Sequence, residues 1–154
     1  MNRTLVEAEK YLFRAKYPHN PLEHRIMETL EYADGSDNVS LAVAAMTRSG
    51  RSSVSSIITP TRTGYTPRMI SRLRLEQPII ALTNDAQIYR QLNMVWGVIP
   101  ILKEGKDIDK MQEFAIIYAQ DSKRVLSGDT VVVVSGLTPF NDEATNTVSI
   151  RTVL

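Results

Sequence analysis

The sequence has no cysteine and only two histidines among its 154 residues. The absence of cysteine excludes disulfides and zinc sites built on thiolates. The two histidines, His19 and His24, show neither the His-x-His nor the His-Glu-x-x-His spacing of common metal sites, and we expect them to be surface residues. The composition thus supports no metal site, and we expect this domain to contain no metal ion or cofactor.

Long apolar runs and an excess of charge of one sign are also missing. No apolar stretch approaches the roughly 18 residues of a membrane-spanning helix, and no secretory signal is evident. The 18 basic and 17 acidic residues leave a net charge of +1, which is not the basic surface that nucleic acid requires. We therefore expect a soluble cytoplasmic protein with no membrane and no nucleic-acid partner.

Neither of the common glycine-rich nucleotide-binding motifs, G-x-G-x-x-G and G-x-x-x-x-G-K-[ST], occurs in the chain. Residues 56–74 instead combine a β-branched apolar run, a hydroxyl-rich turn and a helical pattern. The pattern predicts Thr66 as the N-cap and Pro67 as the first residue of the helix. Gly64, inside the turn, allows a positive φ and a close approach of the backbone to a ligand.

A turn of this kind is suited to binding an anion. Backbone N–H groups at the start of a helix, together with the positive end of its dipole, attract phosphate. Thr61, Thr63 and Thr66 add hydroxyl groups, and Arg62 adds a positive charge inside the turn, whereas Arg68 fits an ordinary solvated helix face. The alternative is a plain strand-to-helix turn whose threonines only cap the helix.

Strand and helix patterns alternate along most of the chain. We divide its single domain into a helical lead-in over residues 1–38, with helices at 3–13 and 22–32, and an α/β core over residues 39–154. A packed helix is predicted at 39–46, buried strands before Thr61 and at 78–83, 98–102 and 130–134, and helices near 85–93 and 109–122. This alternation indicates a parallel sheet with helices on its faces.

The last segment, residues 144–153, differs because apolar and polar residues alternate in it, as in a half-exposed strand. The loop before it is too short to hold a crossover helix, so this strand should run antiparallel at an edge of the sheet. The predicted fold is a three-layer αβα sandwich with a five-stranded, mostly parallel sheet. An open edge strand also predicts a homodimer, in which the C-terminal edge pairs with a second copy.

Several segments together resemble the C-terminal α/β domain of pyruvate kinase. They are IITPTRTGYTPRMIS at 57–71, PIIALTN at 78–84, VWGV at 95–98, SGDTVVVVSG at 127–136 and TNT at 145–147. All follow the order and spacing of that family, and the resemblance covers nearly the whole chain. It implies the same five-stranded sheet and a place in glycolysis.

The resemblance also implies a regulatory role. In pyruvate kinases this domain holds allosteric phosphorylated effectors and helps to build the subunit interface of a tetramer. The implied ligand is a phosphorylated small molecule or inorganic phosphate, and the implied contacts are Thr61, Arg62, Thr63, Gly64, Tyr65 and Thr66. A second candidate region is the loop before the last strand, with Gly136, Thr138 and Asn141.

The sequence departs from the family in that loop. Where family members carry glycines, this chain has Phe140 and Glu143, and Asp142 adds a second carboxylate. Two carboxylates repel a phosphate, and Tyr65 replaces the basic residue that is usual in the turn. We therefore expect a monophosphate, or inorganic phosphate alone, in preference to a sugar bisphosphate.

The family's phosphoryl transfer takes place on a separate (β/α)8 barrel that uses Mg and K ions, and 154 residues leave no room for one. We expect that this chain alone does not convert phosphoenolpyruvate and ADP to pyruvate and ATP. An excised domain, a separate gene product with the same fold and a partner of a barrel elsewhere all fit the sequence. The alternative function is a stand-alone enzyme or sensor for a small phosphorylated metabolite, although no evident nucleophile or general base supports catalysis.

Overall fold

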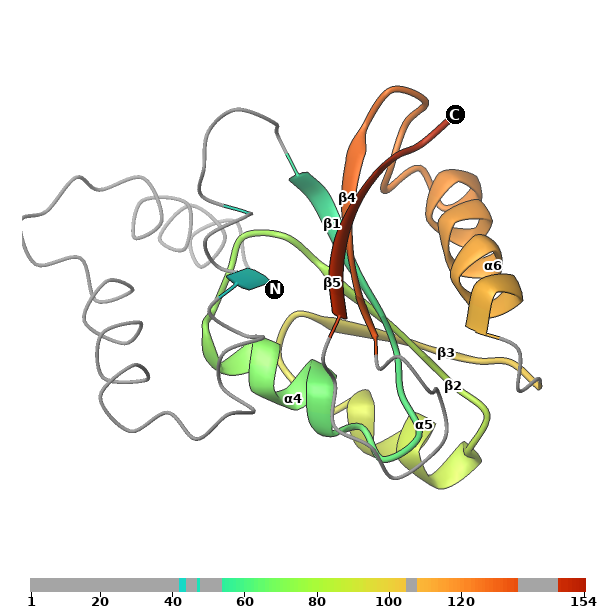
Figure 1. The fold of residues 1–154 in the computed structure, drawn as a ribbon. Coiled ribbons are helices and arrows are strands. Elements are labelled where there is room, and N and C mark those ends of the chain that lie inside the picture. The colour runs from blue at the N-terminus through green and yellow to red at the C-terminus, as the bar shows by residue number, and fades with distance from the viewer. Residues whose placement is uncertain (1–41, 44–46, 48–53, 105–107, 136–146) are drawn as a thin grey trace, which may run out of the picture.

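The computed structural model describes residues 42–43, 47, 54–104, 108–135 and 147–154, and element labels follow Figure 1. These residues form one five-stranded sheet of order β3-β2-β1-β4-β5. The strands are β1 (Val54–Pro60), β2 (Ile79–Thr83), β3 (Val98–Leu102), β4 (Thr130–Ser135) and β5 (Thr147–Thr152). Neighbouring strands are parallel except for β5, which runs antiparallel to β4 at one edge. The predicted fold class and the reversed last strand are confirmed.

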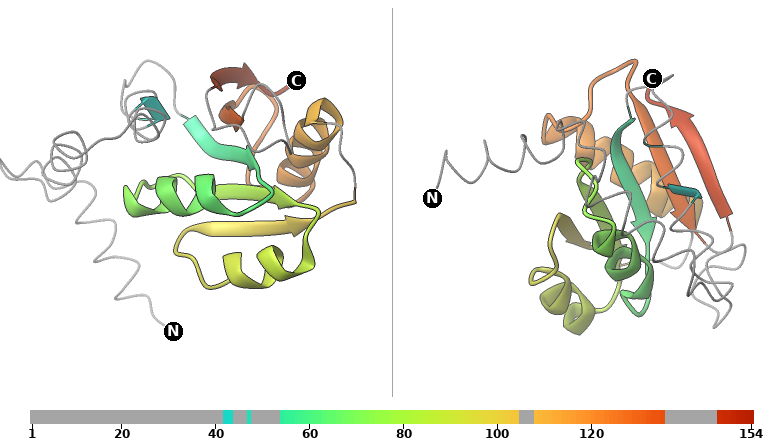
Figure 2. Two further views of the ribbon diagram at one scale, coloured as in Figure 1. Left: turned by 60° about the horizontal axis from the view of Figure 1, so that its bottom comes forward. Right: turned by 90° about the vertical axis from the view of Figure 1, so that its left-hand side faces the viewer.

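The helices α4 (Tyr65–Arg72), α5 (Ala86–Leu92) and α6 (Ile108–Asp121) connect the parallel strands. The order of the strands places α4 and α5 on one face of the sheet and α6 on the other, as Figure 2 shows. Of the helix predicted at 39–46, Ala42 and Val43 are helical, and Val43 is fully buried against the α4 face. The helices predicted at 3–13 and 22–32 lie outside the described residues.

The buried side chains form two clusters, one on each face of the sheet. Ile57 and Ile79 pack on the face that α4 covers, whereas Ile58 and Ile80 pack on the face of α6, against Met111. Successive residues of a strand point to opposite faces, so a strand covered on both sides must be apolar at nearly every position. This requirement explains the unbroken apolar runs that made the inner strands predictable.

Pro100 removes a hydrogen-bond donor from the outer edge of β3. The Gly97 carbonyl accepts a hydrogen bond from the Ile79 N–H at 2.8 Å, and the Lys103 N–H donates to the Thr83 carbonyl at 3.0 Å. Because the direction of the backbone groups alternates along a strand, Pro100 occupies a position whose N–H would point away from β2. The proline therefore costs no bond of the ladder and removes a donor from the open edge.

Asp129 joins the start of β4 to two other segments. Its carboxylate accepts hydrogen bonds from the Leu126 N–H at 2.9 Å and from the Ser55 side chain, and its carbonyl accepts from the Val153 N–H at 2.8 Å. Ser55 lies where the register between β1 and β4 shifts. These bonds to the carboxylate, first that of Leu126 and then that of Ser55, lower the pKa of Asp129.

Stability should therefore depend on pH through Asp129. A lowered pKa in the folded state means that the ionised carboxylate stabilises the fold above the unfolded pKa of about 4, and that this contribution is lost as the pH falls through the folded value. Compared with the unmodified chain, Asp129→Asn should have a lower urea midpoint at neutral pH and should lose less stability between about pH 5 and pH 3. Urea denaturation followed by circular dichroism measures both. Equal losses in the two proteins would contradict this role.

Candidate functional site

The turn of residues 61–66, which comprises the four residues between β1 and α4 and the first two residues of α4, lies at the carboxyl edge of the parallel strands. Its first residue is still part of the sheet, because the Thr61 N–H donates to the Leu82 carbonyl of β2 at 2.7 Å. The following residues leave the sheet and enter α4 at Tyr65. Ligands of open α/β sheets bind at this edge, where the loops that follow the strands come together.

Gly64 occupies the tightest point of the turn. Its φ is +74°, and a Cβ atom added there would lie 3.2 Å from Cγ2 of Ile88, 3.3 Å from Cδ2 of Leu92 and 3.4 Å from Cζ of Arg68. Ile88 and Leu92 belong to α5, which therefore forms the wall behind the turn. Glycine is needed here for two reasons, the left-handed conformation and the lack of space.

Helix α4 begins earlier than the sequence predicted. Gly64, and not Thr66, is the N-cap, and Tyr65, instead of Pro67, is the first helical residue. The N-cap residue has no side chain to cap the helix, and the left-handed Gly64 turns the chain into it. Pro67 is tolerated at the third helical position because the first four N–H groups of a helix have no partner within it.

The threonines of the turn bind to its own backbone. Thr61 is buried, and its Oγ1 accepts a hydrogen bond from the Gly64 N–H at 2.9 Å. Thr63 is exposed, and its Oγ1 accepts from the Tyr65 N–H at 3.4 Å. A hydroxyl that accepts one bond still has a proton to donate, so both threonines retain a donor for an anion. Thr66 is buried within the first turn of α4.

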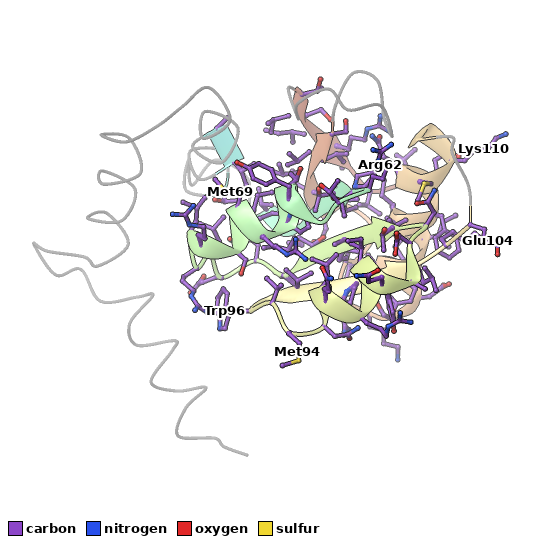
Figure 3. The ribbon with its side chains drawn as sticks, turned by 90° about the horizontal axis from the view of Figure 1, so that it is seen from below. Arg62, Met69, Met94, Trp96, Glu104 and Lys110 are labelled. Atoms are coloured by element: carbon purple, nitrogen blue, oxygen red, sulfur yellow. The ribbon has the colours of Figure 1, made fainter. Side chains whose placement is uncertain are left out.

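Arg62 and Tyr65 are exposed on the turn. Figure 3 shows Arg62 between α4 and the start of α6, whereas Trp96 lies at the other end of α4. The centroid of the Trp96 ring is 4.7 Å from Cζ of Arg74. The backbone carbonyl of Trp96 accepts a hydrogen bond from the Ser71 hydroxyl at 2.6 Å. Trp96 is therefore held away from the turn and contributes nothing to the candidate site.

Arg68 contacts the turn, which the sequence reasoning did not predict because the spacing of Arg68 fits an ordinary solvated helix face. In the structure its Nη1 donates to the Thr63 carbonyl at 3.3 Å, and its Nη2 donates to Oε1 of Gln91 at 2.6 Å. The sequence does contain a signal for this contact, because Arg68 comes four residues after Gly64 and residues four apart on a helix are neighbours. Nothing in the sequence identifies Gln91, which comes from the next helix along the chain.

The other predicted contacts, Gly136, Thr138 and Asn141, lie outside the described residues, and so do Phe140, Asp142 and Glu143. Their loop follows Ser135, the last residue of β4, whose neighbour in the sheet is β1, the strand that leads into the turn. The described part of the chain contains no group of three or more His, Asp or Glu side chains that could hold a metal ion. Among the described helices, none is long and apolar enough to span a bilayer.

The fold and the turn together define a three-layer α/β domain with a candidate anion site at the carboxyl edge of its sheet. The sequence profile of the family described as "Pyruvate kinase, alpha/beta domain" matches residues 39–151. The chain therefore belongs to the pyruvate kinase α/β-domain family, and the resemblance inferred from its motifs is confirmed.

Known relatives agree with this assignment. The chain is 43% identical over 93 residues to the pyruvate kinase of Lactobacillus delbrueckii subsp. bulgaricus, which covers 60% of this chain and 16% of that protein. It is 35% identical over 101 residues to the pyruvate kinases of Staphylococcus saprophyticus and Staphylococcus aureus, which covers 65% of this chain and 17% of each relative. The matched segment is thus less than a fifth of the length of these relatives.

The crowding at Gly64 can be tested against a second glycine of similar conformation. Gly97 has φ +69°, and no described atom lies within 4 Å of the place its Cβ would take. Gly97→Ala should therefore show only the left-handed penalty, about 1 kcal/mol, whereas Gly64→Ala should cost about 2–4 kcal/mol because the methyl group also meets Ile88 and Leu92. Urea denaturation of both variants measures the difference. Equal losses would show that α5 yields to the added methyl group.

Proposed function

We propose that this chain is a regulatory domain of the pyruvate kinase type. It binds a phosphate-bearing small molecule, or inorganic phosphate, in the turn of residues 61–66, and it mediates association between subunits. The observation that carries the binding role is the glycine-capped start of α4 at the carboxyl edge of the sheet, where hydroxyl groups and arginines surround the positive end of a helix.

The charges around the turn support an anionic ligand. The first turn of α4 contains no acidic residue, so nothing there opposes the helix dipole. Arg62 is exposed beside the turn, and both oxygen atoms that Arg68 contacts, the Thr63 carbonyl and Oε1 of Gln91, are uncharged. These contacts leave the positive charge of the Arg68 guanidinium available to an anion.

The ligand that we propose is a monophosphate or inorganic phosphate. Tyr65 is 51% exposed at the start of α4, and it is uncharged where the family resemblance implies a basic side chain. The loop that leaves the sheet after Ser135 also carries the carboxylates of Asp142 and Glu143. A second phosphate group would therefore find fewer cations and more anions than the first.

Phosphate binding should weaken when Thr63 loses its hydroxyl group. Thr63 is exposed, so Thr63→Ala removes a donor for the ligand and leaves the buried Thr61–Gly64 bond in place. We expect an increase in the dissociation constant equivalent to about 0.5–1.5 kcal/mol, or up to about 3 kcal/mol if the bond is charge-assisted. Isothermal titration with inorganic phosphate measures the change. The control is Ser127→Ala, which removes a hydroxyl group just before β4, at the amino end of the parallel strands and so at the end opposite to the turn.

The two ways in which this titration can fail have different meanings. An unmodified chain that binds no phosphate would contradict the binding role itself. Binding that Thr63→Ala leaves unchanged would contradict only the contact assigned to Thr63. A loss in Ser127→Ala equal to that in Thr63→Ala would show that the effect is not local to the turn.

For the second role, we propose that two copies associate through β5. The Val153 N–H donates to the Asp129 carbonyl at 2.8 Å, so alternate residues of this segment direct their backbone groups toward β4. By the same alternation Val148, Ile150 and Thr152 direct theirs away from the sheet. Ile150, which is 52% exposed, lies at the middle of this open row.

Antiparallel pairing of two β5 strands across a two-fold axis satisfies these groups and joins two sheets into one. The opposite edge is a weaker candidate, because Pro100 interrupts the donors of β3. The C-terminal edge strand is thus the better surface for self-association, and one strand, β4, separates it from β1, which the turn follows.

A proline in β5 should separate the backbone contribution to the dimer from the side-chain contribution. Ile150→Pro removes an outward N–H and leaves the bonds to β4 in place, so it should shift the population toward monomer. Ile150→Ala keeps that N–H and should retain more dimer than Ile150→Pro does. Sedimentation velocity over a range of concentrations measures both. A monomer at every concentration of the unmodified chain would contradict the proposal, and a stable tetramer would require a second interface.

A further inference from the structure

We propose that Arg68 is a positioning residue of the anion site and that, together with Gln91, it fastens the turn of residues 61–66 to α5. The expected effect of Arg68 on phosphate binding rests on the proposed function, whereas its expected effect on the backbone of the turn does not. The observations behind this inference are the contacts of the Arg68 side chain with the Thr63 carbonyl of the turn, with the backbone at Gly64 and with Gln91 of α5.

The guanidinium of Arg68 joins two segments that are distant in sequence. One terminal nitrogen, Nη1, donates to the Thr63 carbonyl at 3.3 Å, and the other, Nη2, donates to Oε1 of Gln91 at 2.6 Å. Its Cζ atom lies 3.4 Å from the place of a Cβ at Gly64, so the planar group also packs against the turn. Two donors on a rigid plane suit this bridge, and a lysine ammonium on its flexible stem does not.

The bridge matters because of the peptide unit that it contacts. The Thr63 carbonyl and the Gly64 N–H belong to one planar peptide group. Arg68 binds the carbonyl end of this plane, and Oγ1 of Thr61 accepts from its N–H end at 2.9 Å. With both ends bound, rotation of the plane is restrained, and the direction of the backbone entering α4 is set.

Helix α5 provides the fixed end of the bridge. The Asp85 carboxylate caps it by accepting from the N–H groups of Gln87 at 2.6 Å and Ile88 at 3.1 Å, and Leu92 at its C-terminal end is fully buried. Gln91 therefore lies on an anchored helix, next to the residues that form the wall behind Gly64. The anion site consists of the turn, α4 and α5 together.

The test uses the full chain and the variants Arg68→Ala, Arg68→Lys, Gln91→Ala and the double variant Arg68→Ala/Gln91→Ala. Arg72→Ala is the matched control, because Arg72 is exposed on the same helix and its Nη1 contacts Sδ of Met69 at 3.6 Å and not the turn. The first readout is amide hydrogen exchange at Gly64, measured by NMR without ligand. The second is the dissociation constant for inorganic phosphate.

We expect exchange at Gly64 to become about fivefold faster, and phosphate binding about fivefold weaker, in Arg68→Ala and also in Arg68→Lys. Gln91→Ala should show a smaller effect in the same direction. The double variant should be no worse than Arg68→Ala, because both changes break one bridge and are not additive. Arg72→Ala should match the unmodified chain in both readouts.

Three results would overturn the proposal. If Arg68→Lys behaves like the unmodified chain, only the charge matters. If the losses in the double variant are additive, Arg68 and Gln91 act separately. If Arg72→Ala loses as much as Arg68→Ala, the effect is a general one of charge on α4. If the unmodified chain binds no phosphate, the proposed function fails, and hydrogen exchange alone decides: faster exchange at Gly64 supports positioning, and unchanged exchange refutes it.

Discussion

The close approach of the backbone to α5 at Gly64 is the constraint on which the candidate site depends. The chain must leave β1, reverse direction and enter α4 in a space bounded by Ile88, Leu92 and the guanidinium of Arg68. Only a residue without a side chain satisfies both this space and the left-handed φ. The start of α4, the roles of the turn threonines and the bridge to Gln91 all follow from this arrangement.

Most of the sheet could be predicted from the sequence because the strands carry strong local signals. The inner strands read as continuous apolar runs since both of their faces are covered, and the alternation in the last segment predicted an antiparallel edge strand. The sequence offers Asn84 or Asp85 as a cap for the helix that follows β2, and the structure has Asp85, whose side chain binds N–H groups only two and three residues away.

The details of the site were less predictable because contacts between distant segments decide them. The preference of threonine for N-cap positions predicted Thr66 as the cap, yet packing against α5 places a left-handed glycine there instead. Local spacing likewise assigned Arg68 to the solvent, because its partner Gln91 belongs to a different helix. Membership of the pyruvate kinase α/β-domain family fits this picture, since the chain keeps the sheet that frames the turn.

Pro100 limits how far the sheet can extend beyond one molecule. A sheet with two open edges can add copies on both sides, which is how edge strands lead to fibres. In this domain the edge formed by β3 lacks the donor that a further strand would need at its centre. Pairing of a further strand is therefore less favourable beside β3 than beside β5. A single proline at one edge thus disfavours the open-ended addition of strands on which fibres depend.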